Sequence, residues 1–227
     1  MTDGAARPPQ DSFDAAALHF LGCGSDMCER VRHFDWASTP LGPAEDWPAG
    51  LKVAAGIVLR SLKPMVLLWG DQLVQLHNDA STPFYSWRQP DPLGQPAAAY
   101  WVDTWHVVGP QVDAVRSSGK ASIYRDTALP LLRDGRTEEA YWTYTVTPLV
   151  DETGAVCGVL SEYEETTARV LNERRRQVLD GLGDSLLRCA TPDEVREQAR
   201  AAAASASGDI AGFHIDSPGA PDSIRIE

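Results

Sequence analysis

The chain has 227 residues, 43% of them hydrophobic and 8% aromatic, which is enough apolar material for one or two packed domains. Its formal net charge of −12 argues against a nucleic-acid surface, because phosphate binding needs clustered Lys and Arg. Such a cluster occurs only at residues 174–176. No stretch reaches the roughly 18 to 20 apolar residues of a membrane span, and the N-terminus lacks a secretion signal. We therefore expect a cytoplasmic protein without membrane insertion.

Four cysteines, Cys23, Cys28, Cys157 and Cys189, are too few and too scattered for a disulfide framework or a paired zinc site. We expect reduced thiols and no metal centre. Cys23 and Cys28, with His33 nearby, leave a metal or redox role as an alternative, although a full ligand set is missing.

Residues 1–27 are expected to form a mobile tail and a first helix, and residues 28–63 a helical extension. Helical spacing of apolar residues occurs over Ala15–Leu21, Met27–Phe34 and residues 51–59. This part of the chain therefore predicts helices that precede the main domain.

Residues 64–165 have the pattern of an antiparallel sheet. A hairpin is predicted around Gly70-Asp71, and Asn78 is expected to cap a following helix. Residues 80–119 have helical character broken by prolines, and should cover one face of the sheet. Ala121–Leu132 is predicted to be the third strand.

Two further strands are predicted after residue 138. Trp142, Tyr144 and Val146 alternate with polar or smaller residues, which is the period of a strand with one apolar face. We expect Pro148 to end this strand, and Val156–Tyr163 to form its hairpin partner. The sheet should therefore have five antiparallel strands.

A charged helix is predicted to leave the sheet near Ala168 and to reach Cys189. Leu171, Val178 and Leu182 recur at alternating three- and four-residue spacing, which gives a narrow apolar seam. A seam of this kind is typical of a parallel dimer, so we predict a homodimer formed through the linker helix of residues 166–190.

Several ordered segments carry a resemblance to a known family: residues 35–43, Pro64-Met65 before Trp69-Gly70, residues 78–80, Leu93-Gly94, Gly109-Pro110, and Glu165-Thr166-Thr167 before the charged helix. Over roughly Cys28 to Arg176 the chain resembles the N-terminal PAS domain of bacterial multidomain, often hybrid, sensor histidine kinases. The resemblance implies the α+β PAS fold, a five-stranded antiparallel sheet with covering helices. Residues 191–227 resemble the start of a GAF domain, so a partial GAF-like segment is expected there.

The resemblance also implies a pocket between sheet and helices. We expect Trp142, Tyr144, Val146 and Leu160 to face it, because alternating positions of adjacent strands share a face. Other candidate pocket residues are aromatic: Trp69, Trp101 and Trp105. The alternative is that these aromatic residues simply fill the core.

The cofactor is unknown. The segment Leu93-Gly94-Gln95-Pro96-Ala97 lacks the cysteine of flavin-adduct PAS domains, so no flavin adduct is expected. His106 leaves haem ligation as an alternative, although a lone His on a helix is more often an ordinary residue. Cys23 leaves bilin attachment open, although the surrounding sequence does not resemble a phytochrome.

These observations together predict a sensory input and dimerisation module of a bacterial signalling protein, with downstream signalling domains as partners. The alternative is a ligand-free PAS interaction scaffold. No hydrolase or nucleotide-binding motif is present, and none of the five histidines lies on the helix from Ala168 to Cys189. We therefore expect no catalytic residue and no enzymatic turnover in this chain.

Overall fold

The computed structural model of the chain describes residues 19–22, 24–85, 91–133, 136–205, 214–215 and 224–225. The chain divides between Glu164 and Glu165 into two compact units. The tail expected before His19, Cys23, and residues 206–213, 216–223 and 226–227 of the expected GAF-like segment lie outside the described residues.

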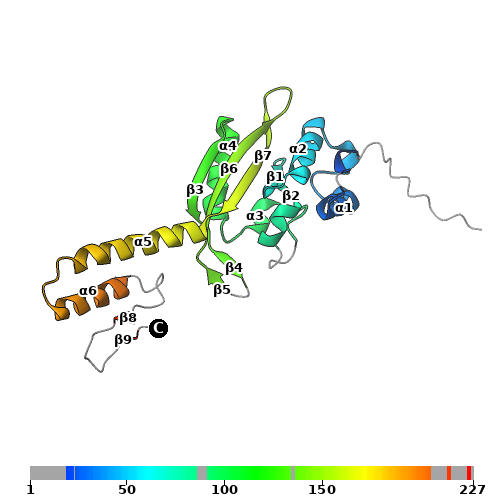
Figure 1. Cartoon of the computed structure of the whole chain (residues 1–227). Coiled ribbons are helices and arrows are strands. Elements are labelled where there is room, and N and C mark those ends of the chain that lie inside the picture. The colour runs from blue at the N-terminus through cyan, green and yellow to red at the C-terminus, as the bar shows by residue number, and fades with distance from the viewer. Residues whose placement is uncertain are drawn as a thin grey trace, which may run out of the picture. The chain divides into compact units, whose positions relative to one another are not determined.

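Short helices open the first unit (Figure 1). Their bounds are η1 (His19–Leu21), α1 (Asp26–His33), η2 (Trp36–Ser38), η3 (Ala44–Asp46) and α2 (Ala49–Arg60). The helical spacing of the sequence predicts η1, α1 and α2, whereas η2 and η3 lie outside the predicted helical segments. Ser25 caps α1, since its hydroxyl accepts a hydrogen bond from the Cys28 amide. The longest of them, α2, places Leu51, Ala55 and Val58 on its buried side.

A five-stranded sheet follows, in the order β2-β1-β7-β6-β3. Its strands are β1 (Met65–Trp69), β2 (Val74–His77), β3 (Ser122–Ala128), β6 (Tyr141–Val150) and β7 (Val156–Glu165). The helices between β2 and β3 are η4 (Asp79–Phe84), α3 (Ala97–Tyr100) and α4 (Trp105–Ser118). The α+β PAS fold, with a five-stranded antiparallel sheet and covering helices, is confirmed (Figure 1).

Both faces of the sheet are covered, which explains why β1 reads as a continuous apolar run. Leu67 and Trp69 belong to a core cluster shared with α1 and α2. Leu68, the residue between them, belongs to a second cluster with Val112 and Val115 of α4. Successive side chains of a strand point to opposite faces, so β1 contributes to both cores.

The expectation of one strand over Ala121–Leu132 is wrong. β3 ends at Ala128, and β4 (Leu131–Arg133) pairs with β5 (Arg136–Glu138) in a separate two-stranded hairpin. The β3–β6 register shifts between Tyr124 and Thr127, where Asp126 has a φ of 48°. A bulge bends the strand there, and Pro130 lacks the N–H that a continued ladder would need.

Pro148 does not end its strand, because β6 continues to Val150. Ser122–Val146 is the β3–β6 pair nearest to it, so Pro148 lies beyond the start of β3. Its missing N–H therefore interrupts no bond to β3, which is how proline is tolerated where a strand becomes an edge.

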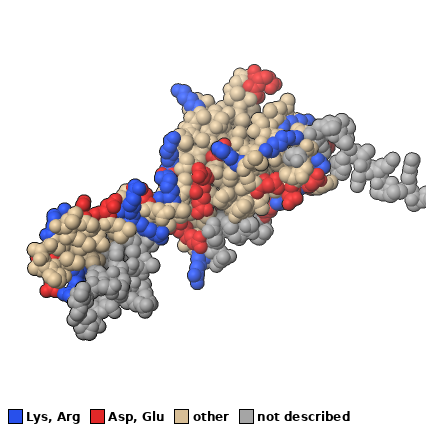
Figure 2. All heavy atoms as spheres, in the orientation of Figure 1, with Lys and Arg blue, Asp and Glu red and all other residues tan. Residues whose placement is uncertain are grey.

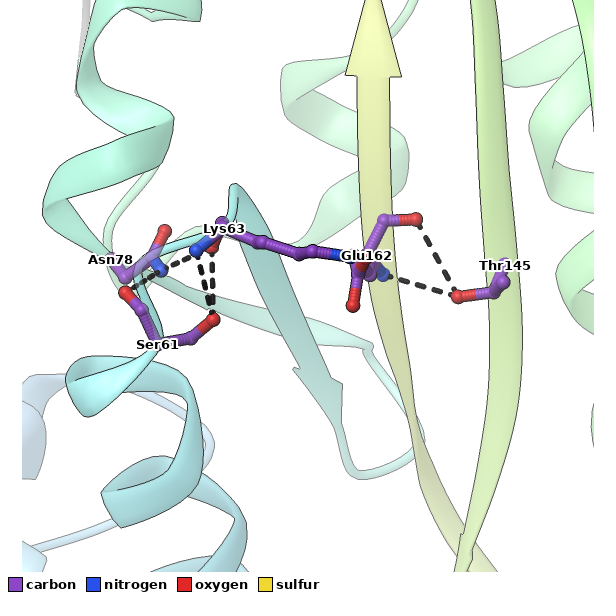
Figure 3. A network of polar contacts seen from close by, with 5 residues as sticks. All are labelled: Ser61, Lys63, Asn78, Thr145 and Glu162. Carbon is purple, nitrogen blue, oxygen red and sulfur yellow. Dashed lines mark hydrogen bonds and ion pairs between the residues drawn. The ribbon is translucent and has the colours of Figure 1, made fainter.

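Asn78 precedes η4 as expected, but its side chain makes no capping hydrogen bond. Instead its Nδ2 donates to the carbonyls of Ser61 and Lys63 at 3.0 and 2.7 Å. Lys63 Nζ in turn lies 2.6 Å from Glu162 Oε1, and the Glu162 amide donates to Thr145 Oγ1 at 3.4 Å (Figure 3). The network joins the α2–β1 connection to the two long strands β6 and β7.

The expectation of reduced thiols is wrong for Cys28, which is disulfide-bonded. It is fully buried in the first core cluster. Cys157 and Cys189 are free, as expected. Four scattered cysteines are too few for a framework of several bridges, but a single bridge needs only two cysteines.

The second unit contains α5 (Thr167–Leu186) and α6 (Pro192–Ser205), which pack against each other, and the short strands β8 (His214–Ile215) and β9 (Ile224–Arg225). Glu194 and Thr191 form a reciprocal cap at α6, with the Glu194 amide donating to Thr191 Oγ1 at 3.3 Å. Gly181 and Gly183 do not interrupt α5. Within the described part of the chain, no helix has the length and apolar character needed to cross a membrane.

Charged side chains are dispersed on the face that Figure 2 shows. Figure 2 shows Lys and Arg scattered between acidic and uncharged residues on the face in view. Among the described residues, no group of three or more His, Cys, Asp or Glu side chains is placed to hold a metal ion.

Candidate functional site

A cavity of about 130 Å³ lies in the first unit, between one face of the sheet and the helices that follow β2. Its described lining residues are apolar, aromatic or uncharged polar: Val66, Leu68, Gln75, Phe84, Tyr85, Trp101, Thr104, Trp105, Val108, Val112, Leu129, Pro130, Leu131, Trp142, Tyr144, Val146, Val159, Ser161 and Tyr163. Every strand of the sheet except the edge strand β3 contributes at least one of them.

Strand register determines which side chains face the cavity. Leu68 pairs with Val159, and the two lie side by side on the cavity face. On β6, Trp142, Tyr144 and Val146 occupy alternate positions and all three line the cavity. Their placement follows from the period of two, and whether they bind a ligand stays a prediction.

The expectation that Leu160 and Trp69 belong to this pocket is wrong. Leu160 pairs with Leu67 and packs against the core cluster under α1 and α2, and Trp69 belongs to that same cluster. Both lie on the opposite sheet face from Val159, because a shift of one residue reverses the side-chain direction.

Trp101 and Trp105 lie on the helical side of the cavity. Trp105 opens α4, and its ring lies over Gly109, where an added Cβ would come within 2.8 Å of Trp105 Nε1. Glycine at position 109 therefore leaves the space that this ring occupies. His106, the haem alternative, is exposed and is not a lining residue.

Gln75 is the polar residue of β2 that the sequence reasoning missed. Its side chain is fully buried, and its Oε1 accepts a hydrogen bond from Trp101 Nε1 at 2.7 Å. Both of its backbone groups bond to one neighbouring segment, since its amide donates to the Gln95 carbonyl and its carbonyl accepts from the Gly94 amide. The buried Gln75 Nε2 has no hydrogen-bond partner.

The aromatic hydroxyl and indole groups around the cavity are mostly paired with the protein. Tyr163 donates to the Tyr85 hydroxyl at 3.0 Å, and Trp142 Nε1 donates to the Leu129 carbonyl at 3.2 Å. Tyr144 donates to Gln111 Oε1. Burial raises the pKa of Tyr85 and of Tyr163 far above the ordinary value, so both phenols are neutral.

His77 lies two residues after Gln75, and its ring centroid is 4.6 Å from that of Tyr85. Burial lowers its pKa to about 4, with a smaller contribution from Arg30 and an opposing one from Asp91 and Asp79. The imidazole is therefore neutral at pH 7, and its Nδ1 has no hydrogen-bond partner. The signal that could have found both residues is the alternation of Gln75 and His77 with apolar Val74 and Leu76.

No protein-family model and no curated protein matches the chain. Similar solved structures include an RNA-binding light-oxygen-voltage receptor, with 12% identity, 63% of this chain and 40% of that chain covered, and a TM-score of 0.44. The PAS domain of Bordetella pertussis BvgS has 16% identity over 59% of this chain and 98% of its own, with a TM-score of 0.41. A PAS domain from Colwellia psychrerythraea has 19% identity over 52% and 98%, with a TM-score of 0.38. These similarities concern the fold alone.

Proposed function

We propose that this chain is the cytoplasmic sensory input and dimerisation module of a signal-transduction protein related to sensor histidine kinases. A small molecule binds in the cavity, and binding alters β7 and the helix that follows it. Downstream signalling domains receive the change. The chain itself carries out no turnover.

The observation that supports this proposal is the position of β7. Val159, Ser161 and Tyr163 of this strand line the cavity, and the strand ends at Glu165, two residues before α5 begins. A ligand that contacts β7 therefore acts on the strand from which α5 departs. A few kcal/mol of differential binding is enough to shift a two-state element.

A ligand-free interaction scaffold is the second candidate, and the size of the cavity favours it. About 130 Å³ is below the roughly 300 to 1,000 Å³ of common ligand pockets. A scaffold would keep such a space as ordinary imperfect packing. The two candidates differ in whether the cavity binds anything at all.

The test is ligand binding to the intact chain and to a variant whose cavity is filled. Native mass spectrometry before and after denaturation detects a co-purified ligand, and thermal shift against small uncharged compounds detects an added one. Val108→Phe introduces a ring into the cavity wall, and Val53→Phe is the matched control, because Val53 is 63% exposed on α2. We expect binding to the parent and the control and none to Val108→Phe.

The same data can reject the proposal. If no compound binds the parent chain and no ligand co-purifies, the scaffold function replaces the sensory one. Equal binding to Val108→Phe and Val53→Phe would place the ligand outside the cavity, with the same consequence.

A further inference from the structure

We propose that Gln75 recognises the ligand, and that the ligand is a small, uncharged, planar aromatic molecule with a hydrogen-bond acceptor on its ring. This inference rests on the proposed sensory function, since it names the chemical class that the cavity takes. It follows from the hydrogen bonding of one buried amide, the absence of charge in the described lining, and the shape of the walls.

The orientation of the Gln75 amide is fixed by its neighbour. An indole N–H can only donate, and Trp101 Nε1 lies 2.7 Å from Gln75 Oε1. The oxygen must therefore face Trp101, which leaves Nε2 to face another group. Among the described cavity residues, Gln75 is the one with a fully buried side-chain polar atom that has no partner.

A buried amide N–H without an acceptor costs about 1 to 3 kcal/mol. A ligand acceptor placed against Gln75 Nε2 removes that cost, whereas a purely apolar ligand leaves it in place. The backbone of Gln75 is bonded to Gly94 and Gln95, and the bond from Trp101 Nε1 to Oε1 holds its side-chain amide in one position. The site therefore discriminates between ligands of equal shape by the presence of an acceptor.

Charge on the ligand is disfavoured by the walls. The described lining residues include no Asp, Glu, Lys, Arg or His, and the neighbouring His77 is neutral at pH 7 because burial lowers its pKa to about 4. An ion transferred into such a space loses its hydration without gaining a counter-charge.

An aromatic ligand fits the size and walls of the cavity. An apolar cavity of about 150 Å³ binds benzene, and this cavity has about 130 Å³. Rings of Phe84, Trp142 and Tyr163 stand edge-on to one another with centroids 5.2 to 6.0 Å apart. Such rings offer both faces and edges to a planar guest.

Pyridine and benzene form the matched pair of probes, because they share a shape and only pyridine has an acceptor. Dissociation constants at pH 7.5, where pyridine is uncharged, are measured by NMR titration for the parent chain, for Gln75→Met and for Gln72→Met. Methionine keeps the length of the side chain and has no donor, and Gln72 makes the same exchange at an exposed position that does not line the cavity. We expect Gln75→Met to weaken the binding of pyridine about tenfold and to leave the binding of benzene unchanged, and Gln72→Met to change neither affinity.

The outcomes separate this inference from the proposed function. If both probes bind and Gln75→Met changes their dissociation constants by the same factor, the cavity binds ligands but Gln75 does not select them. That result contradicts this inference and leaves the proposed sensory function standing. If neither probe binds the parent chain, the inference falls together with this support for the sensory function. A crystal structure with pyridine in which Gln75 Nε2 bonds only an ordered water would also overturn the inference about Gln75.

Trp101→Phe provides a second variant. Loss of the indole that orients the Gln75 amide should reduce the preference for pyridine over benzene without changing Gln75 itself.

Discussion

His77 makes stability dependent on pH, because it is 1% exposed and its pKa is lowered from 6.5 to about 4 by burial. Between these two values the unfolded chain binds a proton that the folded chain does not. The free energy of unfolding should therefore fall as pH decreases from 6.5 towards 4, by about 3 kcal/mol in total at 1.36 kcal/mol per pH unit. Above pH 6.5 this contribution is constant.

Chemical unfolding at several pH values between 7.5 and 4.5 measures this loss. His77→Gln should show a smaller decrease than the parent chain, since glutamine does not titrate. His33→Gln is the control, because the His33 side chain is 72% exposed. Equal pH dependence of the parent and His77→Gln would contradict the assignment.

Residue-level prediction succeeded where only strand alternation was needed. Trp142, Tyr144 and Val146 could be placed on one face from their spacing, since the period of two fixes relative direction. Leu160 could not be placed, because its face depends on the pairing of Leu160 with Leu67, which no local pattern reveals. Gln75 was missed because a polar residue in a short strand looks like a solvent-facing one until the covering helices are known.

At the scale of single strands, Gly158 is required by the close approach of β1. A Cβ at this position would lie 2.5 Å from the Leu68 carbonyl oxygen and 3.0 Å from the Trp69 ring. Gly158→Ala should therefore destabilise the first unit by roughly 1 to 3 kcal/mol. Gly183→Ala is the control on α5, where an added Cβ meets nothing within 4 Å and should leave the first unit unchanged.

Thermal unfolding followed by tryptophan fluorescence measures the effect, because every tryptophan in the sequence lies between residues 36 and 142. A decrease of several degrees is expected for Gly158→Ala. An unchanged midpoint would mean that β1 and β7 separate easily at this point.

Elements with strong periodicity were predictable, and those that depend on tertiary contacts were not. The helix at Ala49–Arg60 and the strands β6 and β7 follow from local pattern. The β4–β5 hairpin does not, because β3 ends at Ala128 shortly after a bulge at Asp126, whose positive φ is unusual for a residue other than glycine. The continuation of β6 past Pro148 could not be predicted either, because it depends on where the neighbouring strand β3 begins.

At the scale of the whole molecule, the predicted homodimer depends on α5. Leu171, Val178 and Leu182 are half-buried within one chain, and no residue of α5 is fully buried. Leu171→Glu with Val178→Glu places two charges in the predicted seam, which should weaken the dimer at least about tenfold.

Light scattering across a range of concentrations measures the oligomeric state. The control is Gln177→Glu with Gly183→Glu, which adds the same charge at exposed positions of α5 outside the seam. The seam is wrong if the parent is monomeric, or if the seam variant dimerises as well as the control. In that case the packing of α6 against α5 is the contact that covers this helix.

The position of β7 also affects how the protein is made. In the sheet order β2-β1-β7-β6-β3, β7 lies in the middle, although it is the last of these strands to be synthesised. Until Glu165 has been added, β1–β2 and β3–β6 are two hairpin-like pieces, each with an edge that lacks its neighbour. Because α5 begins two residues later, the strand that completes the sheet directly precedes this helix in the chain. A nascent chain that stops earlier exposes both open edges to other chains, so premature termination within this domain produces an aggregation-prone fragment rather than a smaller sensor.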